Sequence, residues 1–231
     1  HASGKVLNSL FDISPVVGIS LGAIIIISYT LLGGFFAVAW TDLIQGILMI
    51  GTLVILPITG FIHIINSNKS IVTGLIEADS IFQNNNLSLV SGAYGLDALF
   101  VVLGGLSWGL GYLGQPHLVI RYMAIRSIKE VDKARKIAIL WAIPGVMGAF
   151  MVGIVALVYF GPNYFLLNDP EKAMPILASS ILHPVIAGLF ISGAVAAMMS
   201  TADSQLLVST SAVTEDFFHQ YLNFDLSEKR L

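Results

Sequence analysis

The stretch GGLSWGLGYLGQPHLVIRYMAI, residues 104–125, is apolar enough for a lipid bilayer, yet it contains five glycines, a proline, a histidine, a glutamine and an arginine. Glycine lowers helix propensity by about 1 kcal/mol relative to alanine, and proline removes a backbone donor. We therefore expect the helix to unwind between Gly111 and Pro116. Unwound backbone is tolerated at membrane depth only where protein buries it or where it lines a wet cavity, so the stretch is a candidate ligand site.

Two aromatic residues lie four positions apart just before the expected break. At this spacing Trp108 and Tyr112 share one helix face, where they offer a flat apolar wall and two polar groups to a small solute. The same residues fit a second interpretation, in which the glycines allow close helix packing and the aromatic pair lies in the core of a bundle. The residues alone do not separate the two.

Composition places the whole chain in the membrane class. Of its 231 residues 56% are hydrophobic and 11% are charged, whereas a soluble domain carries about 25% charged residues. The net charge of −3 gives no basic surface for nucleic acid, and the absence of cysteine excludes disulfides and Cys-ligated metals. The chain begins with His and without a signal peptide, so we interpret it as a fragment of a longer membrane protein.

Five stretches are long and apolar enough to cross a bilayer, and they predict an all-α, polytopic membrane helix bundle. Ser14 and Pro15 are typical of a helix start, and Pro57 is expected to kink the second span. A tight corner is expected at Trp40–Asp42, and a short amphipathic helix at 71–82. The predicted spans are residues 15–39, 41–65, 96–125, 137–160 and 184–213.

Lysine and arginine gather in one connection, which orients the predicted spans. The connection 126–136 holds five of these residues, whereas the loops 66–91 and 161–183 hold one each. Because short cytoplasmic loops are enriched in basic residues, we predict that the connection 126–136 and the C-terminal tail 214–231 are cytoplasmic. The other two loops and the N-terminal stub are then outside.

A dense polar cluster interrupts the last predicted span. Hydroxyl oxygens together with main-chain carbonyls suit a hard monovalent cation that must be released again. Hydroxyls in membrane helices also bond back to their own helix or hold helices together, and this alternative stays open. The cluster consists of Ser200, Thr201, Asp203, Ser204 and Gln205.

Two charged residues lie near the inner ends of predicted spans. Asp42 fits either a helix N-terminal charge or a staging point for a cation that moves inward. Arg121 fits a side chain that extends to the cytoplasmic surface. Catalysis is poorly supported, because no hydrolase, zinc-protease or P-loop motif occurs and a Ser200–Asp203–His219 triad would place its histidine on the tail.

Three motifs in this order resemble the sodium:solute symporter family: GGFFAVAWTDLIQG (33–46), LSWGLGYLGQPHLVIRYMAIRS (106–127) and AAMMSTADSQLLVSTSAVTEDFF (196–218). The resemblance implies a LeuT-like core of two inverted five-helix repeats. The chain would hold the end of repeat one (1–65), an extracellular loop (66–92) and the first three helices of repeat two (93–231).

The resemblance also implies a function. The expected protein is a secondary active transporter of the cell membrane, not an enzyme, that couples inward sodium flow to uptake of a small amino acid, with L-proline as the favoured solute. A sodium-coupled carrier of another small solute is the alternative, followed by a cation channel. Sodium is the only ion implied, with no organic cofactor, and the expected partners are the solute, the bilayer and the missing helices of the full-length protein, without nucleic acid.

Individual roles follow from the matched motifs. Trp108, Gly111, Tyr112 and Pro116 would form the substrate site. Ala197 through its carbonyl, and Ser200 and Thr201 through their hydroxyls, would bind sodium, with further ligands from the missing helices. Asp42 would lie on the sodium path, and Arg121 would serve coupling or gating. Some symporters of the family that transport proline have small uncharged residues at the two positions where this sequence has Asp203 and Ser204.

Overall fold

The structure is a computed structural model of the whole chain, and it describes residues 2–82, 88, 90, 92–161 and 169–221. Four helices are long and apolar enough to cross a membrane: α2, α4, α6, and α8 together with the π-helical turns that follow it. The described residues contain no strand, so the predicted all-α class is confirmed. In chain order the helices are α1 (Ala2–Phe11), α2 (Pro15–Asn66), α3 (Ile71–Phe82), α4 (Leu96–Leu113), α5 (Pro116–Met123), α6 (Ile128–Phe160), the 3₁₀ turn η2 (Pro170–Lys172), α7 (Ala173–Ile181), α8 (Pro184–Ser211) and the π-helix η3 (Ala212–Tyr221).

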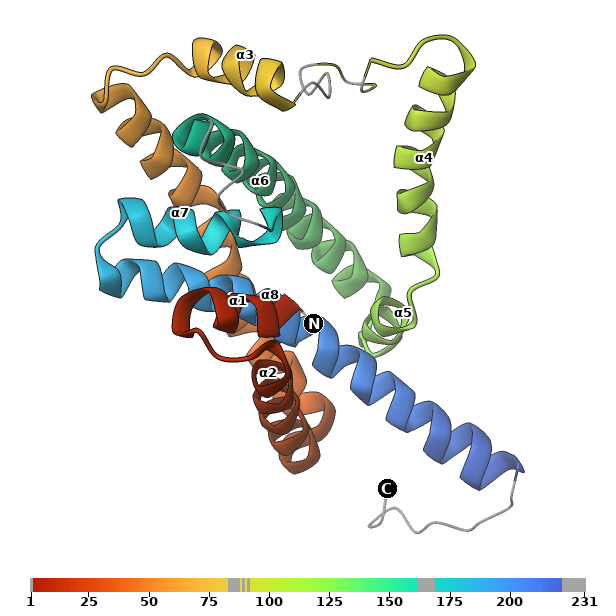
Figure 1. Cartoon of the computed structure of the whole chain (residues 1–231). Coiled ribbons are helices and arrows are strands. Elements are labelled where there is room, and N and C mark those ends of the chain that lie inside the picture. Colours follow the sequence, from red (N-terminus) through yellow and green to blue (C-terminus); the bar gives the residue numbers. More distant parts are fainter. Residues whose placement is uncertain (1, 83–87, 89, 91, 162–168, 222–231) are drawn as a thin grey trace.

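The first two predicted spans form one element, α2, which is broken at Gly34. This residue has φ 52° and ψ −147°, whereas the backbone at Pro57 stays helical. Tyr29 bonds to Asp203, and Asp42 is joined through Arg121 to Ser204. Residues 29 and 42 would lie about 20 Å apart on a straight helix, so α2 must fold back between them, as Figure 1 shows at the lower end of the view.

The corner expected at Trp40–Asp42 is therefore wrong, because those residues are helical and the chain turns at Gly34 instead. The φ/ψ values of Gly34 are accessible to glycine almost alone. The Gly33-Gly34 pair was the signal in the sequence, since paired glycines mark turns. Ser14 caps the helix as expected and accepts from the Val17 amide at 3.4 Å.

A substitution at Gly34 tests the fold-back. We expect Gly34→Ala to lower the stability of the full-length protein by about 1–3 kcal/mol, because a Cβ strains this backbone conformation. Gly51→Ala is the matched control, since Gly51 lies in the same helix with nothing within 4 Å of an added Cβ. Thermal unfolding in detergent measures both variants. Equal midpoints for Gly34→Ala and Gly51→Ala would contradict a strained turn at Gly34.

The third predicted span is divided where the sequence predicted a break. α4 ends at Leu113, Gly114 and Gln115 leave the helix, and α5 begins with Pro116 as its first residue. Gly109 and Gly111 remain helical. The unwinding is therefore confirmed for the second half of the predicted stretch, next to the proline that cannot donate a backbone bond.

Helical structure extends beyond the spans that the sequence predicted. α6 begins at Ile128, nine positions before the predicted start, because Ser127 caps it and accepts from the Glu130 amide at 3.4 Å. The short helix at 71–82 is confirmed as α3, while α1 and α7 were missed. The tail predicted from residue 214 is helical to Tyr221, and residues 222–231 lie outside the described part.

The core of the bundle lies where α2, α6 and α8 meet, and small residues allow the close approach. A Cβ on Gly148 of α6 would lie 2.1 Å from the Leu53 carbonyl oxygen of α2, and one on Gly193 of α8 would lie 2.3 Å from Thr52 Oγ1. Leu56, Val155 and Leu177 are fully buried around these contacts. Packing through small residues is the usual way in which helices associate in lipid.

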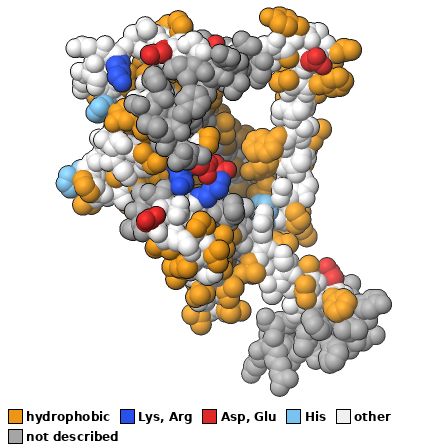
Figure 2. Space-filling model, viewed as in Figure 1, with side chains coloured by type: hydrophobic (Ala, Val, Ile, Leu, Met, Phe, Trp, Pro, Cys, Tyr) orange, Lys and Arg blue, Asp and Glu red, His pale blue; other side chains and the backbone are white. Residues whose placement is uncertain are grey.

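The helix α1 is joined by ion pairs to the segment before α7. Lys5 Nζ lies 3.0 Å from Asp169 Oδ2 and 2.7 Å from Glu171 Oε2, and Figure 2 shows basic and acidic side chains side by side near α7 and α1. The hydrogen bonds with Glu171 and Asp169 raise the pKa of Lys5, and the bond from Lys5 lowers the pKa of Asp169. This pairing agrees with the prediction that the N-terminal stub and the loop 161–183 share one side.

Candidate functional site

A chain of polar side chains joins four helical segments inside the bundle. Asp203 of α8 is fully buried, and Tyr29 Oη from the first part of α2 donates a hydrogen bond to its Oδ2 at 2.6 Å. The next residue, Ser204, has a relative exposure of only 4%. A buried carboxylate requires hydrogen-bond donors or a counter-charge. Asp203 is therefore stabilised by Tyr29 and by Arg121, which contacts Ser204.

Arg121 connects that chain to the second part of α2. Its Nη2 donates both to Asp42 Oδ2 and to Ser204 Oγ. The side chain of Asp42 is 10% exposed and that of Arg121 is 42% exposed, so the acid is enclosed while the arginine side chain is only partly covered. Asp42 and Arg121, which the sequence singled out separately, thus form one ion pair that joins α2 to α5.

Ser204 also links the chain to the predicted sodium-binding turn. Its hydroxyl donates to the Ser200 carbonyl at 2.7 Å and lies 3.3 Å from Asp203 Oδ1. A serine hydroxyl has one proton, so the shorter contact to Ser200 holds it. Ser204 thus contacts Arg121, Asp203 and the turn that contains Ser200.

Two oxygens near this chain have no donor among the described residues. Asp42 Oδ1 and Gln45 Oε1, one helical turn apart on α2, are both buried and unpaired. Buried acceptors without a partner are rare in native proteins, and an ion or water is the usual explanation. They add acceptor oxygens beside the Asp42–Arg121 pair.

The three residues predicted to bind sodium lie together on one turn of α8. Ser200 Oγ and Thr201 Oγ1 donate to the Ala197 carbonyl at 3.1 and 3.2 Å. This is the back-bonding alternative considered above, although the lone pairs of each hydroxyl remain available to a cation. Their role as sodium ligands stays a prediction.

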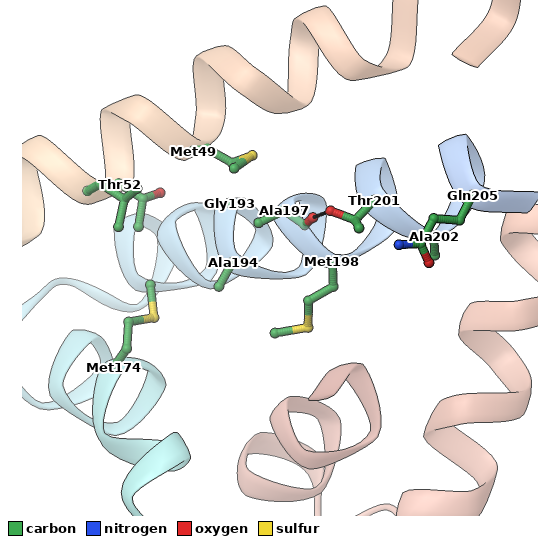
Figure 3. A pocket seen from close by; sticks show the side chains of 11 residues that line it. Met49, Thr52, Met174, Gly193, Ala194, Ala197, Met198, Thr201, Ala202 and Gln205 are labelled. Atoms are coloured by element: carbon green, nitrogen blue, oxygen red, sulfur yellow. Dashed lines mark hydrogen bonds between the residues drawn. The ribbon is translucent and has the colours of Figure 1, made fainter. Parts of the chain in front are cut away.

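Ala197 and Thr201 also line a cavity of about 640 Å³ between α2, α7 and α8. Figure 3 shows Thr201 and Gln205 on α8, with Met49 and Thr52 on α2 opposite and Met174 on α7. The lining is mostly apolar, with Thr201 and Gln205 at one end and Thr52 at the other. Two of the three candidate sodium ligands, Ala197 and Thr201, thus adjoin an open, largely apolar space.

The aromatic pair predicted to contact the solute lies on one face of α4, as its spacing indicated. The rings of Trp108 and Tyr112 are 4.9 Å apart in an edge-to-face arrangement. They are 67% and 50% exposed, and α4 has no buried residue. The structure therefore does not bring Trp108, Gly111 and Tyr112 to the turn of α8 that holds Ala197 (Figure 1).

Sequence reasoning missed Tyr29 and Gln45. Tyr29 lies in the run IIIISYTLLGG, where a lone phenol among aliphatic residues was the available signal. An intramembrane polar group is functional by default, and Asp203 already required a donor. The contact between them could not be found in the sequence, because 174 positions separate the two residues.

The model of the sodium:solute symporter family matches residues 1–231. The chain belongs to this family. It is 35% identical over 230 residues to the high-affinity proline transporter PutP of Bacillus subtilis (strain 168), and the matched region covers 100% of this chain and 47% of the relative. It is also 35% identical over 230 residues to the osmoregulated proline transporter OpuE of the same organism, with 45% of that relative covered.

A third relative is the sodium/proline symporter of Staphylococcus aureus (strain USA300), which is 37% identical over 219 residues, with 94% of this chain and 40% of the relative covered. The chain thus spans less than half the length of the curated relatives it matches. No solved structure matches it significantly. Family and helical content together establish a polytopic membrane protein.

Proposed function

We propose that this chain is part of a symporter that couples inward sodium flow to the uptake of a small amino acid, L-proline in the first instance. The observation that carries the proposal is the family match over residues 1–231. The names of the relatives support proline as the solute. Proteins of this type bind ion and solute where membrane helices lose their regular winding, which agrees with the break at Gly114–Gln115.

For the ion we propose the oxygens of Ala197, Ser200 and Thr201 as the part of the sodium site that this chain supplies. The cavity beside Ala197 and Thr201 supports this assignment, because it leaves room for ligands from other helices of the full-length protein. Asp42, with its unpaired Oδ1, is proposed as a station on the inward path. Sodium must bind the two conformations of the carrier with different affinity in order to couple to the solute.

For the solute we propose Trp108 and Tyr112 as the aromatic wall and Gly111 and Pro116 as the flexible part of the site. The T-shaped pair and the adjacent helix break support this assignment. We further propose a LeuT-like core in which residues 1–65 end repeat one, 66–92 form an extracellular loop and 93–231 begin repeat two. Residues 126–136 and the C-terminal tail are proposed to be cytoplasmic.

Uptake of radiolabelled proline into proteoliposomes of the full-length protein tests the function. We expect accumulation when sodium is driven inward by its concentration difference or by an inside-negative potential, and none when both are absent. A potential of 100 mV alone contributes about 2.3 kcal/mol per charge, roughly fifty-fold in accumulation. A cation channel, the alternative, would pass sodium far faster than any carrier turnover and would not concentrate proline.

Two substitutions separate the ion site from the solute site. We expect Thr201→Ala to raise the sodium concentration required for half-maximal uptake by about tenfold, which corresponds to one lost oxygen ligand of about 1.4 kcal/mol. Tyr112→Ala should instead weaken proline affinity more than sodium affinity. Tyr94→Ala is the control, because Tyr94 is 87% exposed and lies outside both sites. Unchanged sodium dependence in Thr201→Ala would remove this residue from the sodium site.

A further inference from the structure

The charged start of α6 projects beyond the part of the helix that a bilayer can cover. With 33 residues the helix is about 50 Å long, while the hydrocarbon core of a bilayer is about 30 Å thick. Residues 137–160 contain no charged side chain and are about 36 Å long, so they can cross the core by themselves. The surplus is therefore the first turns, which hold Lys129, Lys133 and Lys136, with Arg126 just before the Ser127 cap.

The three lysines form a stripe on one face of α6. Positions 129, 133 and 136 fall within an arc of about 60° at 100° per residue, and no Asp or Glu of this segment lies within it. All three are exposed, and none forms an ion pair with any residue that the structure describes. The Asp132–Arg135 pair, at 2.9 Å, lies on a different face.

The same face continues as apolar surface toward the middle of the membrane. Leu140, Ile143 and Met147 extend the line of the lysines and are 75%, 61% and 52% exposed. The bundle-facing side is opposite, where Val131 and Ala134 are half-buried and Gly145 and Gly148 are buried. One helix face thus changes from basic to apolar along its length, as at the boundary between lipid headgroups and acyl chains.

The geometry points to a docking surface for anionic phospholipids: the headgroups bind the stripe of Lys129, Lys133 and Lys136, and the acyl chains lie along Leu140, Ile143 and Met147. The charge of the stripe complements a lipid phosphate, and the apolar continuation distinguishes a lipid from a soluble phosphate. Basic groups just cytoplasmic of a spanning helix are attracted to an anionic leaflet by an amount that corresponds to about fivefold in binding for each side chain. This inference does not depend on the transported solute.

The test uses the full-length protein in nanodiscs that contain phosphatidylglycerol and phosphatidylcholine in equal amounts and with identical acyl chains. Lipids retained by the protein are counted by native mass spectrometry. We expect the wild-type protein to retain phosphatidylglycerol preferentially. The variant Lys129→Gln/Lys133→Gln/Lys136→Gln should lose this preference by about fivefold for each lysine removed. The control Asp132→Asn/Arg135→Gln, on the same turns but off the stripe, should keep it.

An unchanged preference in the triple variant would overturn the proposal. A salt series on the wild-type protein tests the proposal even if the triple variant does not fold. Raising NaCl from about 20 to about 500 mM should reduce the preference, because the Debye length falls to a few ångströms, and a preference that does not respond to salt would also overturn it. Displacement of the lipid by soluble glycerol phosphate would show a phosphate site instead of a lipid surface.

Discussion

Replacing Arg121 with Gln is expected to destabilise the full-length protein more than replacing Asp42 with Asn, although the two side chains share one ion pair. Without Arg121, the enclosed carboxylate of Asp42 loses its counter-charge. Without the charge of Asp42, the Arg121 side chain is still 42% exposed and keeps its bond to Ser204. We expect a loss of about 2–3 kcal/mol for Arg121→Gln, below the 3–5 kcal/mol of a fully buried pair.

The double variant Arg121→Gln/Asp42→Asn gives the decisive comparison. Removing both charges leaves no unpaired buried ion, so the double variant should be more stable than Arg121→Gln alone. Thermal unfolding in detergent measures the cycle, with Arg135→Gln as a control from an exposed pair on α6. A double variant less stable than both single variants would contradict a pair dominated by the buried acid.

Transport should separate from stability in the same variants. Asp42→Asn should fold, yet it should require more sodium for half-maximal proline uptake, because Asp42 carries the unpaired Oδ1 on the proposed inward path. The double variant should recover stability without recovering sodium affinity. Recovery of both together would show that Asp42 acts only as the partner of Arg121.

Much of the helical framework could be predicted from local sequence. Long apolar runs, the Ser14-Pro15 start and the break predicted for Gly111–Pro116 depend on residue types at neighbouring positions. The structure has the runs and the start, and it has the break in the second half of the predicted stretch. The reversal in α2 was misplaced because both Gly33-Gly34 and Trp40–Asp42 interrupt an apolar run, and only the backbone angles show which one turns. α7 was missed because its nine residues are too few to cross a bilayer.

The candidate site was predicted only as separate residues. Asp42, Arg121 and Ser200 were found because charged and hydroxyl groups are costly in lipid. That Arg121 joins Asp42 to Ser204 depends on how α2, α5 and α8 cross, and no spacing in the sequence contains that information. The exposure of Trp108 and Tyr112 could not be predicted either, because helical periodicity shows only which residues share a face.

We expect the hydrogen bond from Tyr29 to Asp203 to make the second largest contribution to stability, after the Asp42–Arg121 pair. The proton of Ser204 is held by the Ser200 carbonyl, so Tyr29 is the principal side-chain donor to a carboxylate that is fully buried. A hydrogen bond to a charged group contributes about 1.5–3 kcal/mol. We therefore expect Tyr29→Phe to cost about 2 kcal/mol, while Tyr94→Phe, at an exposed tyrosine, should leave the unfolding midpoint unchanged.

Removing the acid together with its donor should restore stability. Asp203→Ser leaves the half-buried hydroxyl of Tyr29 without its acceptor, but Tyr29→Phe/Asp203→Ser leaves neither group unpaired and should unfold within about 1 kcal/mol of the wild-type protein. If the double variant were the least stable of the three, Asp203 would have donors other than Tyr29. Ser204 lies between Asp203 and the Ser200 carbonyl. Loss of the bond to Asp203 in Tyr29→Phe should therefore also raise the sodium concentration for half-maximal uptake. Proline affinity at saturating sodium should stay the same, because Asp203 adjoins the proposed ion site and not the aromatic pair on α4.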